Sequence, residues 1–130
     1  MKPLVSVVLP TYNRADLMAE AITSVLSQTH SRLELIIADD GSTDNTEEVA
    51  RSFSDKRIVY LKLPHAGLPA PPRNRGIEAS KGEFIAFLDS DDLWLESKIE
   101  KSLNGFVKAP DAGIICSNEY ILLEHAGKTT

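Results

Sequence analysis

The sequence contains almost no cysteine and no long apolar run. Cys116 is its single cysteine, so a domain held together by internal disulfides is excluded, and a reducing compartment fits. Because Cys116 lies in the apolar run 113–116, we expect it to be buried and structural. No stretch approaches the about 20 apolar residues that span a bilayer, and the N-terminal run Leu4–Leu9 is too short for a signal peptide. These absences predict a cytoplasmic protein with no transmembrane segment.

Positive charge is also scarce. Lys and Arg number 14 against 19 Asp and Glu, which gives a formal net charge of −5. Nonspecific affinity for nucleic acid comes mainly from Lys and Arg that neutralise phosphates, so this balance predicts no nucleic-acid partner. An acidic protein that binds a phosphate ligand needs additional positive charge, which a divalent metal would supply.

The common motifs for phosphate and for metal are missing too. Neither Gly-x-x-x-x-Gly-Lys-Ser/Thr nor Gly-x-Gly-x-x-Gly occurs, so no glycine-rich loop is available to bind phosphate. An EF-hand that starts at Asp89 is excluded, because Leu93 and Trp94 occupy its fifth and sixth positions. The histidines lack metal-ligand spacing, and we interpret them as solvated or loop residues: His30, His65 and His125.

Apolar residues alternate between two periods along the 130 residues, whose number suits one domain, 1–130. Short apolar runs predict strands over 4–9, 33–38, 58–61, 84–88, 112–116 and 120–123. Apolar residues spaced three and four apart predict helices over 16–26, 46–53, 72–80 and 95–107. This alternation predicts an α/β fold with a mostly parallel sheet and helices on both faces.

Polar clusters follow three of the predicted strands. Thr11–Arg14 comes after the first strand, Asp39–Ser42 after the second, and Asp89–Asp92 after the strand over 84–88. The carboxyl ends of parallel strands share one edge of the sheet, and ligands of open α/β sheets bind at that edge. We therefore expect the three clusters to converge on one site.

The cluster Asp89–Asp92 places three carboxylates in four positions. It follows the apolar run 84–88, which we expect to be a strand buried on both faces. Neighbouring carboxylates repel one another, so a divalent metal is a natural counter-charge. The alternative is a solvated acidic turn that caps the next helix.

Taken in order, these segments resemble a family 2 glycosyltransferase of the GT-A fold, a group of inverting enzymes that use nucleotide-diphosphate sugars. The resemblance covers nearly the whole chain and rests on the segments 5–14, 24–29, 34–44, 73–76 and 82–92. It implies that 1–130 is the N-terminal, Rossmann-like part that binds the nucleotide sugar, typically a UDP-sugar.

The resemblance also implies roles for individual residues. Asp40 would accept a hydrogen bond from the base, typically uracil; the alternative is a turn-forming residue. Thr11, Tyr12 and Arg14 match the wall of the nucleotide pocket, where Tyr12 can stack on the base or, alternatively, pack in the core. Arg73 is a candidate for the nucleotide or its phosphates, with solvated helix surface as the alternative.

The segment Asp89-Ser90-Asp91 matches the family's Asp-x-Asp signature. By the resemblance, Asp91 would bind Mn²⁺ or Mg²⁺, and Asp89 would approach the ribose or the metal and its water. Asp92 would instead cap the following helix. The metal would bridge both phosphates and stabilise charge on the departing nucleoside diphosphate.

An inverting transfer also needs a general base that deprotonates the acceptor hydroxyl. In the family this Asp or Glu lies downstream of the metal motif, and Glu119 and Glu124 come too early to match it. The resemblance therefore implies a glycosyltransferase of which this chain is a piece without the base, inactive alone toward its unknown acceptor. The alternative is a natural short relative of the family. Such a piece leaves apolar surface uncovered, so we also expect a homodimer.

Two other classes of function compete with this interpretation. A non-catalytic nucleotide-diphosphate-binding or regulatory module would bind the same ligand without sugar transfer. A phosphoacceptor signalling domain built around Asp39 and Asp40 fits less well, because its acidic pair should follow the first strand and its partner lysine has no candidate.

Overall fold

The computed structural model describes residues 2–117, 124–125 and 128–129. The chain forms two compact units, Met1–Ile99 and Glu100–Thr130. Within the described residues, no helix is both long enough and apolar enough to cross a membrane.

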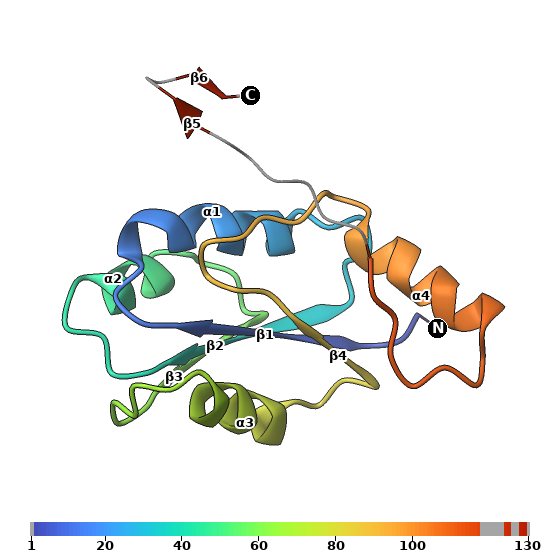
Figure 1. The fold of residues 1–130 in the computed structure, drawn as a ribbon, viewed down its shortest axis with the longest axis horizontal. Helices are drawn as coiled ribbons and strands as arrows, with labels where there is room; N and C mark the ends of the chain where they lie inside the picture. The colour runs from blue at the N-terminus through green and yellow to red at the C-terminus, as the bar shows by residue number, and fades with distance from the viewer. Residues whose placement is uncertain (1, 118–123, 126–127, 130) are drawn as a thin grey trace. The chain divides into compact units, whose positions relative to one another are not determined.

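A four-stranded parallel sheet forms the centre of the first unit, in the order β3-β2-β1-β4 (Figure 1). Its strands are β1 (Val5–Thr11), β2 (Leu33–Asp39), β3 (Ile58–Lys62) and β4 (Phe84–Phe87). Each strand lies within a residue or two of its predicted range. The register pairs Val5 with Leu33 and Thr11 with Asp39, so β1 and β2 end at the same level.

Three helices cover the two faces of this sheet. They are α1 (Ala15–Leu26), α2 (Thr46–Arg51) and α3 (Ala70–Ala79). Figure 1 shows α1 and α2 on one face and α3 on the other. The predicted α/β fold, with a mostly parallel sheet and helices on both faces, is confirmed.

The core lies between the two central strands and the helices above and below them. It consists of side chains with little or no exposed surface, among them Val7, Val8, Leu9, Met18, Ile22, Leu35, Ile36 and Ile37. Strands that are covered on both faces need apolar residues at every position rather than at alternate ones. This explains why β1 and β2 were visible in the sequence as continuous apolar runs.

The strand β4 differs from its prediction. We expected it to be buried on both faces, but Ile85 is 41% exposed and Phe87 is 49% exposed. The two residues alternate along the strand and lie on the same face, so the reason is that the described residues leave this face of the edge strand β4 partly uncovered. Its apolar run continues into Leu88, which is buried.

The helix α3 packs on β1 through a glycine. A Cβ placed on Gly76 would lie 2.4 Å from Cγ1 of Val8, so the absence of a side chain lets the helix approach the sheet closely. The helix starts at Ala70, two residues before its predicted start. Proline is tolerated in a first helical turn because its missing N–H has no partner there, so Pro71 and Pro72 fit inside the helix.

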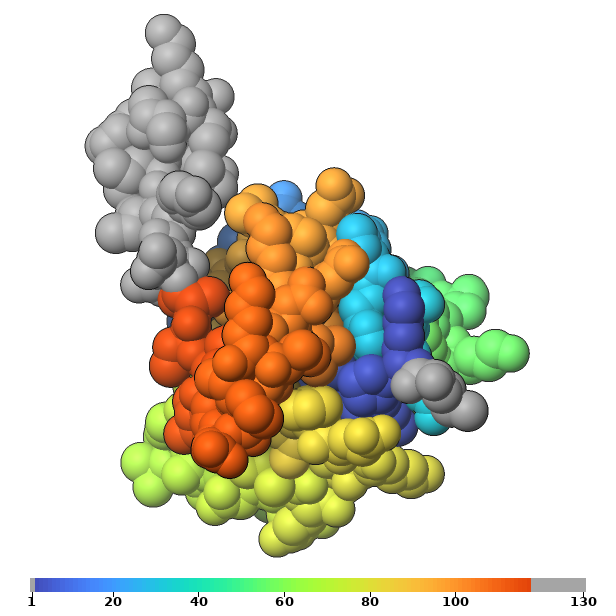
Figure 2. Space-filling model, turned by 90° about the vertical axis from the view of Figure 1, so that its right-hand side faces the viewer, coloured from blue at the N-terminus to red at the C-terminus, as the bar shows by residue number. Residues whose placement is uncertain are grey.

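A buried histidine lies at the amino end of the sheet, where β1 and β2 begin. Nε2 of His30 lies 2.9 Å from the main-chain oxygen of Pro3 and 3.1 Å from that of Arg32. Figure 2 shows the start of β1 (dark blue) beside the segment around residue 30 (cyan). His30 is thus a loop residue, as interpreted, but it is buried rather than solvated.

The C-terminal segments depart most from prediction. Helix α4 (Lys98–Lys108) begins three residues after its predicted start at Leu95, which is strongly exposed. The predicted strand over 112–116 is irregular, and Cys116 is exposed rather than buried. A strand needs a neighbour for its hydrogen bonds, and the described residues provide none for this segment.

Beyond that segment, β5 (Glu124–His125) pairs antiparallel with β6 (Lys128–Thr129). The predicted strand over 120–123 lies outside the described residues.

Candidate functional site

The loops after β1, β2 and β4 meet at one edge of the sheet. The N–H of Asp40 donates to the main-chain oxygen of Thr11 at 2.9 Å, which joins the ends of β1 and β2. On the other side of β1, the N–H of Leu88 donates to the main-chain oxygen of Val8 at 3.1 Å. The parallel topology therefore brings the three predicted polar clusters to the same edge.

Asn13 ties the first two of these loops together. Its N–H donates to Oγ of Ser42 at 2.9 Å, and its side-chain Oδ1 accepts from the N–H of Thr43 at 2.8 Å. Asn13 has φ of 50°, a left-handed conformation that asparagine tolerates better than most residues. Arg14 follows as the exposed N-cap residue of α1 on the same loop.

Thr11 ends β1 with a buried hydroxyl group. The residue is only 5% exposed, and its Oγ1 is the buried side-chain polar atom without a hydrogen-bond partner among the described residues. A buried hydroxyl that has no partner costs free energy unless a ligand or water satisfies it. Its place at the site edge makes Thr11 a candidate hydrogen-bonding group for a ligand.

Asp39 has a structural role. It is fully buried, and one carboxylate oxygen accepts from the N–H of Ser42 at 2.9 Å and from its hydroxyl at 2.6 Å. The hydroxyl of Tyr60 donates to the other oxygen. Burial, together with this hydrogen bond to Asp39, raises the pKa of Tyr60. With its oxygens committed to protein donors, Asp39 does not fit the phosphoacceptor alternative.

Replacing Tyr60 with Phe is expected to lower the free energy of unfolding by about 1–3 kcal/mol, because the buried Asp39 carboxylate loses a donor. Urea denaturation at pH 7 measures this loss. A raised pKa stabilises the fold at pH values below the ordinary tyrosine value of 10.0, and this contribution is lost as the pH rises through the folded value. The difference between the two proteins should therefore shrink as the pH rises above 10.0 toward the folded value; equal stability at pH 7 would contradict the prediction.

Asp40 faces the loop between β3 and α3. Its carboxylate is almost fully buried and accepts from the N–H of Ala66 at 2.8 Å and from that of Gly67 at 3.1 Å. Nδ1 of His65 lies 2.9 Å from the main-chain oxygen of Asp40 and 3.1 Å from its Oδ2. These contacts show that Asp40 does more than form a turn, and its hydrogen bond to a base stays a prediction.

Tyr12 lies beside the same loop. Its ring stacks on His65, with 4.4 Å between the ring centroids and 27° between the planes. Tyr12 is 40% exposed, so the core-packing alternative is wrong. Sequence reasoning missed His65, since its place in a proline-rich loop carries no motif that points to Tyr12 or Asp40.

A cavity of about 250 Å³ lies next to Asp40. Its lining includes Pro64 on the loop after β3, and Pro71, Asn74 and Arg75 on α3. The prolines give the cavity an apolar wall. Asp40 also lines the cavity and, as described above, accepts hydrogen bonds from the loop between β3 and α3. The residues that line the cavity do not include the acidic cluster, so the two are separate features of this edge.

Arg73 and Asp89 form an ion pair. The guanidinium Nη2 of Arg73 lies 3.1 Å from Oδ1 of Asp89, and both side chains are exposed. Each was predicted separately to lie at the site, and the structure brings them together. An exposed pair of this kind adds at most about 1 kcal/mol of stability, so its importance lies in placing a cation beside the acidic cluster.

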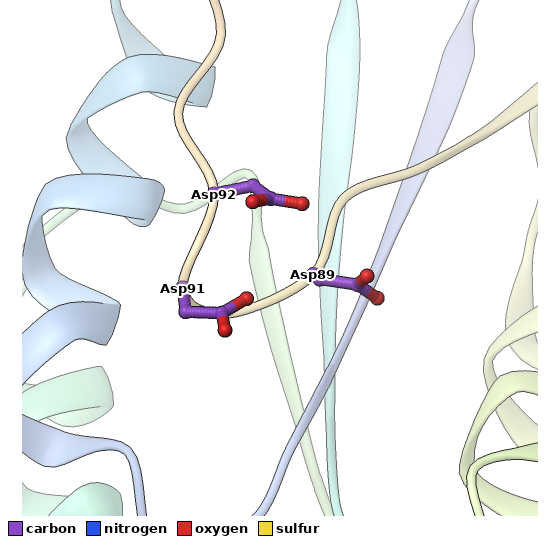
Figure 3. A group of neighbouring side chains, drawn as sticks. All are labelled: Asp89, Asp91 and Asp92. Carbon is purple, nitrogen blue, oxygen red and sulfur yellow. The ribbon is translucent and has the colours of Figure 1, made fainter. Parts of the chain in front are cut away.

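The acidic cluster consists of Asp89, Asp91 and Asp92, all exposed on the loop after β4 (Figure 3). One carboxylate oxygen from each residue lies within 4.8 Å of the others. Asp92 was expected to cap the next helix, but α4 begins only at Lys98, so this expectation is wrong. Three carboxylate oxygens at this spacing fit a hard divalent cation such as Mg²⁺ or Mn²⁺.

Fold and site together define a Rossmann-like α/β domain whose polar loops gather at the carboxyl edge of a parallel sheet. Open α/β domains bind their ligands at this edge. The family "Glycosyl transferase family 2" matches residues 6–127, and the chain belongs to that family. The resemblance noted from the sequence is thereby confirmed.

Two curated relatives are similar over most of this chain. A putative teichuronic acid biosynthesis glycosyltransferase of Bacillus subtilis, TuaG, is 43% identical over 78% of the chain. An Escherichia coli UDP-Glc:alpha-D-GlcNAc-diphosphoundecaprenol beta-1,3-glucosyltransferase, WfgD, is 42% identical over 81%. The matched parts make up 41% and 42% of these relatives, so the chain spans less than half of their length.

Solved structures agree with the fold. S. aureus TarS 1-349 in complex with UDP superposes with a TM-score of 0.76 at 29% identity, over 83% of this chain and 32% of that one. The mannosyltransferase PcManGT from Pyrobaculum calidifontis, in complex with GDP-Man and Mn²⁺, gives 0.72 at 26% identity. That match covers 87% of this chain and 34% of that one.

Proposed function

We propose that this chain is the donor-binding part of an inverting glycosyltransferase that uses a nucleotide-diphosphate sugar, typically a UDP-sugar. The observation that carries the proposal is the meeting of Thr11, Asp40 and the acidic cluster at one edge of the sheet. Family membership supports the reaction class. The UDP complex of TarS and the name of the Escherichia coli relative support a uridine nucleotide.

The base side of the proposed site is formed by the loops after β1 and β2. Tyr12 offers an exposed ring for stacking, which suits a flat heterocycle. The unpartnered hydroxyl of Thr11 offers a hydrogen bond to the nucleoside. Asp40 offers a carboxylate that two backbone N–H groups hold in place. A carboxylate only accepts hydrogen bonds, so Asp40 would accept one from a donor on the base.

The diphosphate side is formed by the loop after β4 and the start of α3. Asp91 and Asp89 would hold Mn²⁺ or Mg²⁺, with Asp92 close enough to contribute. When bound, the cation would neutralise negative charge on the departing nucleoside diphosphate. Arg73 lies beside Asp89 and would add a fixed positive charge near the phosphates. The PcManGT complex with Mn²⁺ supports a metal in this kind of site.

The acceptor side is not assigned to any residue of the chain. We place donor binding and leaving-group activation at this edge of the sheet. Homodimer formation and a cytoplasmic location also stay predictions.

Calorimetry with UDP, GDP and dTDP, with and without Mn²⁺, tests the proposal. We expect UDP to bind more tightly in Mn²⁺ than in chelator by about 10- to 100-fold, which is the usual range of coupling between two ligands. dTDP shares the ring N–H of UDP but lacks the 2′-hydroxyl of the ribose and carries a 5-methyl group on the base, so it tests whether the ring N–H alone is enough for binding. Equal UDP affinity in chelator would contradict the metal role, and no binding of any of the three would contradict the proposed function.

A further inference from the structure

The loop between β3 and α3 contacts both residues that we assign to the base. His65 stacks on the ring of Tyr12 with 4.4 Å between centroids. The same imidazole reaches Asp40 through Nδ1, at 2.9 Å from the main-chain oxygen and 3.1 Å from Oδ2. One side chain therefore links the stacking residue and the hydrogen-bonding residue.

The hydrogen on His65 follows from its neighbours. Nδ1 of His65 lies close to two oxygens of Asp40, one in the main chain and one in the carboxylate. Both oxygens can only accept hydrogen bonds, so Nδ1 carries a hydrogen and donates it. This holds for the neutral ring with hydrogen on Nδ1 and for the protonated ring. The contact therefore does not depend on the charge of His65.

The Asp40 carboxylate has nearly all of its acceptor positions filled. A carboxylate offers about four acceptor positions. Oδ2 receives the N–H of Gly67 and lies near Nδ1 of His65, whereas Oδ1 receives only the N–H of Ala66. Oδ1 thus keeps one position, which suits a single N–H donor on a ligand.

A glycine in the turn after β2 lets the loop between β3 and α3 come close to Asp40. Gly41 has φ of 79°, and a Cβ placed there would lie 2.9 Å from the backbone nitrogen of His65. Gly67 also has a positive φ, 75°, where the chain turns its N–H toward Asp40. The conformations of these two glycines therefore keep His65 close to Asp40 and Tyr12.

We propose that His65 is a positioning residue for nucleobase recognition. It orients the Tyr12 ring and fixes the Asp40 carboxylate, so that the free position on Oδ1 accepts from a base with a ring N–H, such as uracil. Cytosine presents a lone pair at the same ring position, which the carboxylate repels. This inference rests on the proposed function, and it adds that the preference for UDP over CDP depends on His65.

The test compares UDP and CDP binding in Mn²⁺ for the wild type and the variants His65→Ala, His65→Asn and His65→Phe. In His65→Ala we expect UDP affinity to fall about tenfold, since a net hydrogen bond and a ring contact are lost. CDP affinity should change less, so the ratio of UDP affinity to CDP affinity should fall in His65→Ala. His65→Asn keeps an N–H donor near the Nδ1 position and should recover most of the preference; His65→Phe keeps only the stack and should not.

Two further measurements separate positioning from a structural role. Leu68→Ala changes a strongly exposed side chain of the same loop and should leave both affinities unchanged. The thermal midpoint of each variant reports its folding, and His65→Phe serves as the loss variant if His65→Ala does not fold. A wild type that binds no nucleotide overturns the proposed function. A wild type that prefers UDP, with the same preference in His65→Ala and His65→Phe, overturns only the role of His65, as would tighter UDP binding by His65→Ala.

Discussion

Replacing Asp91 with alanine will remove most of the gain in UDP affinity that Mn²⁺ provides, a loss of about 10- to 100-fold. Asp91 supplies one of three carboxylates whose oxygens lie within 4.8 Å of one another. Without it, the remaining pair holds a divalent cation less tightly and leaves more of the diphosphate charge uncompensated. Calorimetry of UDP binding at fixed Mn²⁺ concentration measures the loss.

A thermodynamic cycle isolates the contribution of the metal to this loss. In chelator, Asp91→Ala should bind UDP no more weakly than the wild type, because no cation is present in either and the variant has one carboxylate fewer to repel the diphosphate. Asp91 is exposed, so the substitution should change the free energy of unfolding by no more than about 0.5 kcal/mol.

Asp111→Ala removes an exposed carboxylate that does not belong to the cluster, and it is the matched control for the change in net charge. If Asp91→Ala keeps the full response to Mn²⁺, Asp91 is not a ligand. The same measurements on Asp89→Ala and Asp92→Ala then identify the residues that are.

The second large effect concerns stability rather than binding. Replacing Gly76 with alanine is expected to lower the free energy of unfolding by about 2 kcal/mol. The new Cβ would lie 2.4 Å from Cγ1 and 3.2 Å from Cγ2 of Val8, which is fully buried in β1. Overpacking of this kind costs up to about 3 kcal/mol, and the better helix propensity of alanine offsets about 1 kcal/mol.

A compensating substitution tests the cause. Val8→Ala removes both methyl groups that the new Cβ would meet, so Gly76→Ala should cost far less in that background. Urea denaturation of the four proteins gives a coupling free energy of about 2 kcal/mol in favour of the double variant. Gly113→Ala is the control, because a Cβ there meets nothing within 4 Å. Strictly additive effects of the two substitutions would contradict the close contact between α3 and β1.

The same contact bears on the site. Arg73 lies one helical turn before Gly76 on α3 and pairs with Asp89. A helix pushed away from β1 would carry Arg73 away from the acidic cluster. Gly76→Ala is therefore also expected to weaken UDP binding, whereas Gly113→Ala is not.

The sequence by itself determined the central strands and the place of the site. Residues 7–9 and 35–38 had to be apolar at every position because both faces of these strands are covered, and this pattern is local. Once parallel strands alternate with helices, chain direction alone brings the ends of β1, β2 and β4 to one edge. The positions of Thr11, Asp40 and Asp91 at that edge followed without any knowledge of packing.

Only the tertiary structure decided which surfaces are covered and which side chains meet. The apolar run of β4 predicted two buried faces, yet Phe87 is exposed, because an apolar pattern does not show whether another element covers a given face of the strand. The apolar run that ends at Cys116 likewise predicted a strand. The segment is irregular, because no strand among the described residues pairs with it. His65 contacts Tyr12 and Asp40 across more than 20 positions of sequence, and such contacts depend on how a loop packs in space, which no local spacing encodes.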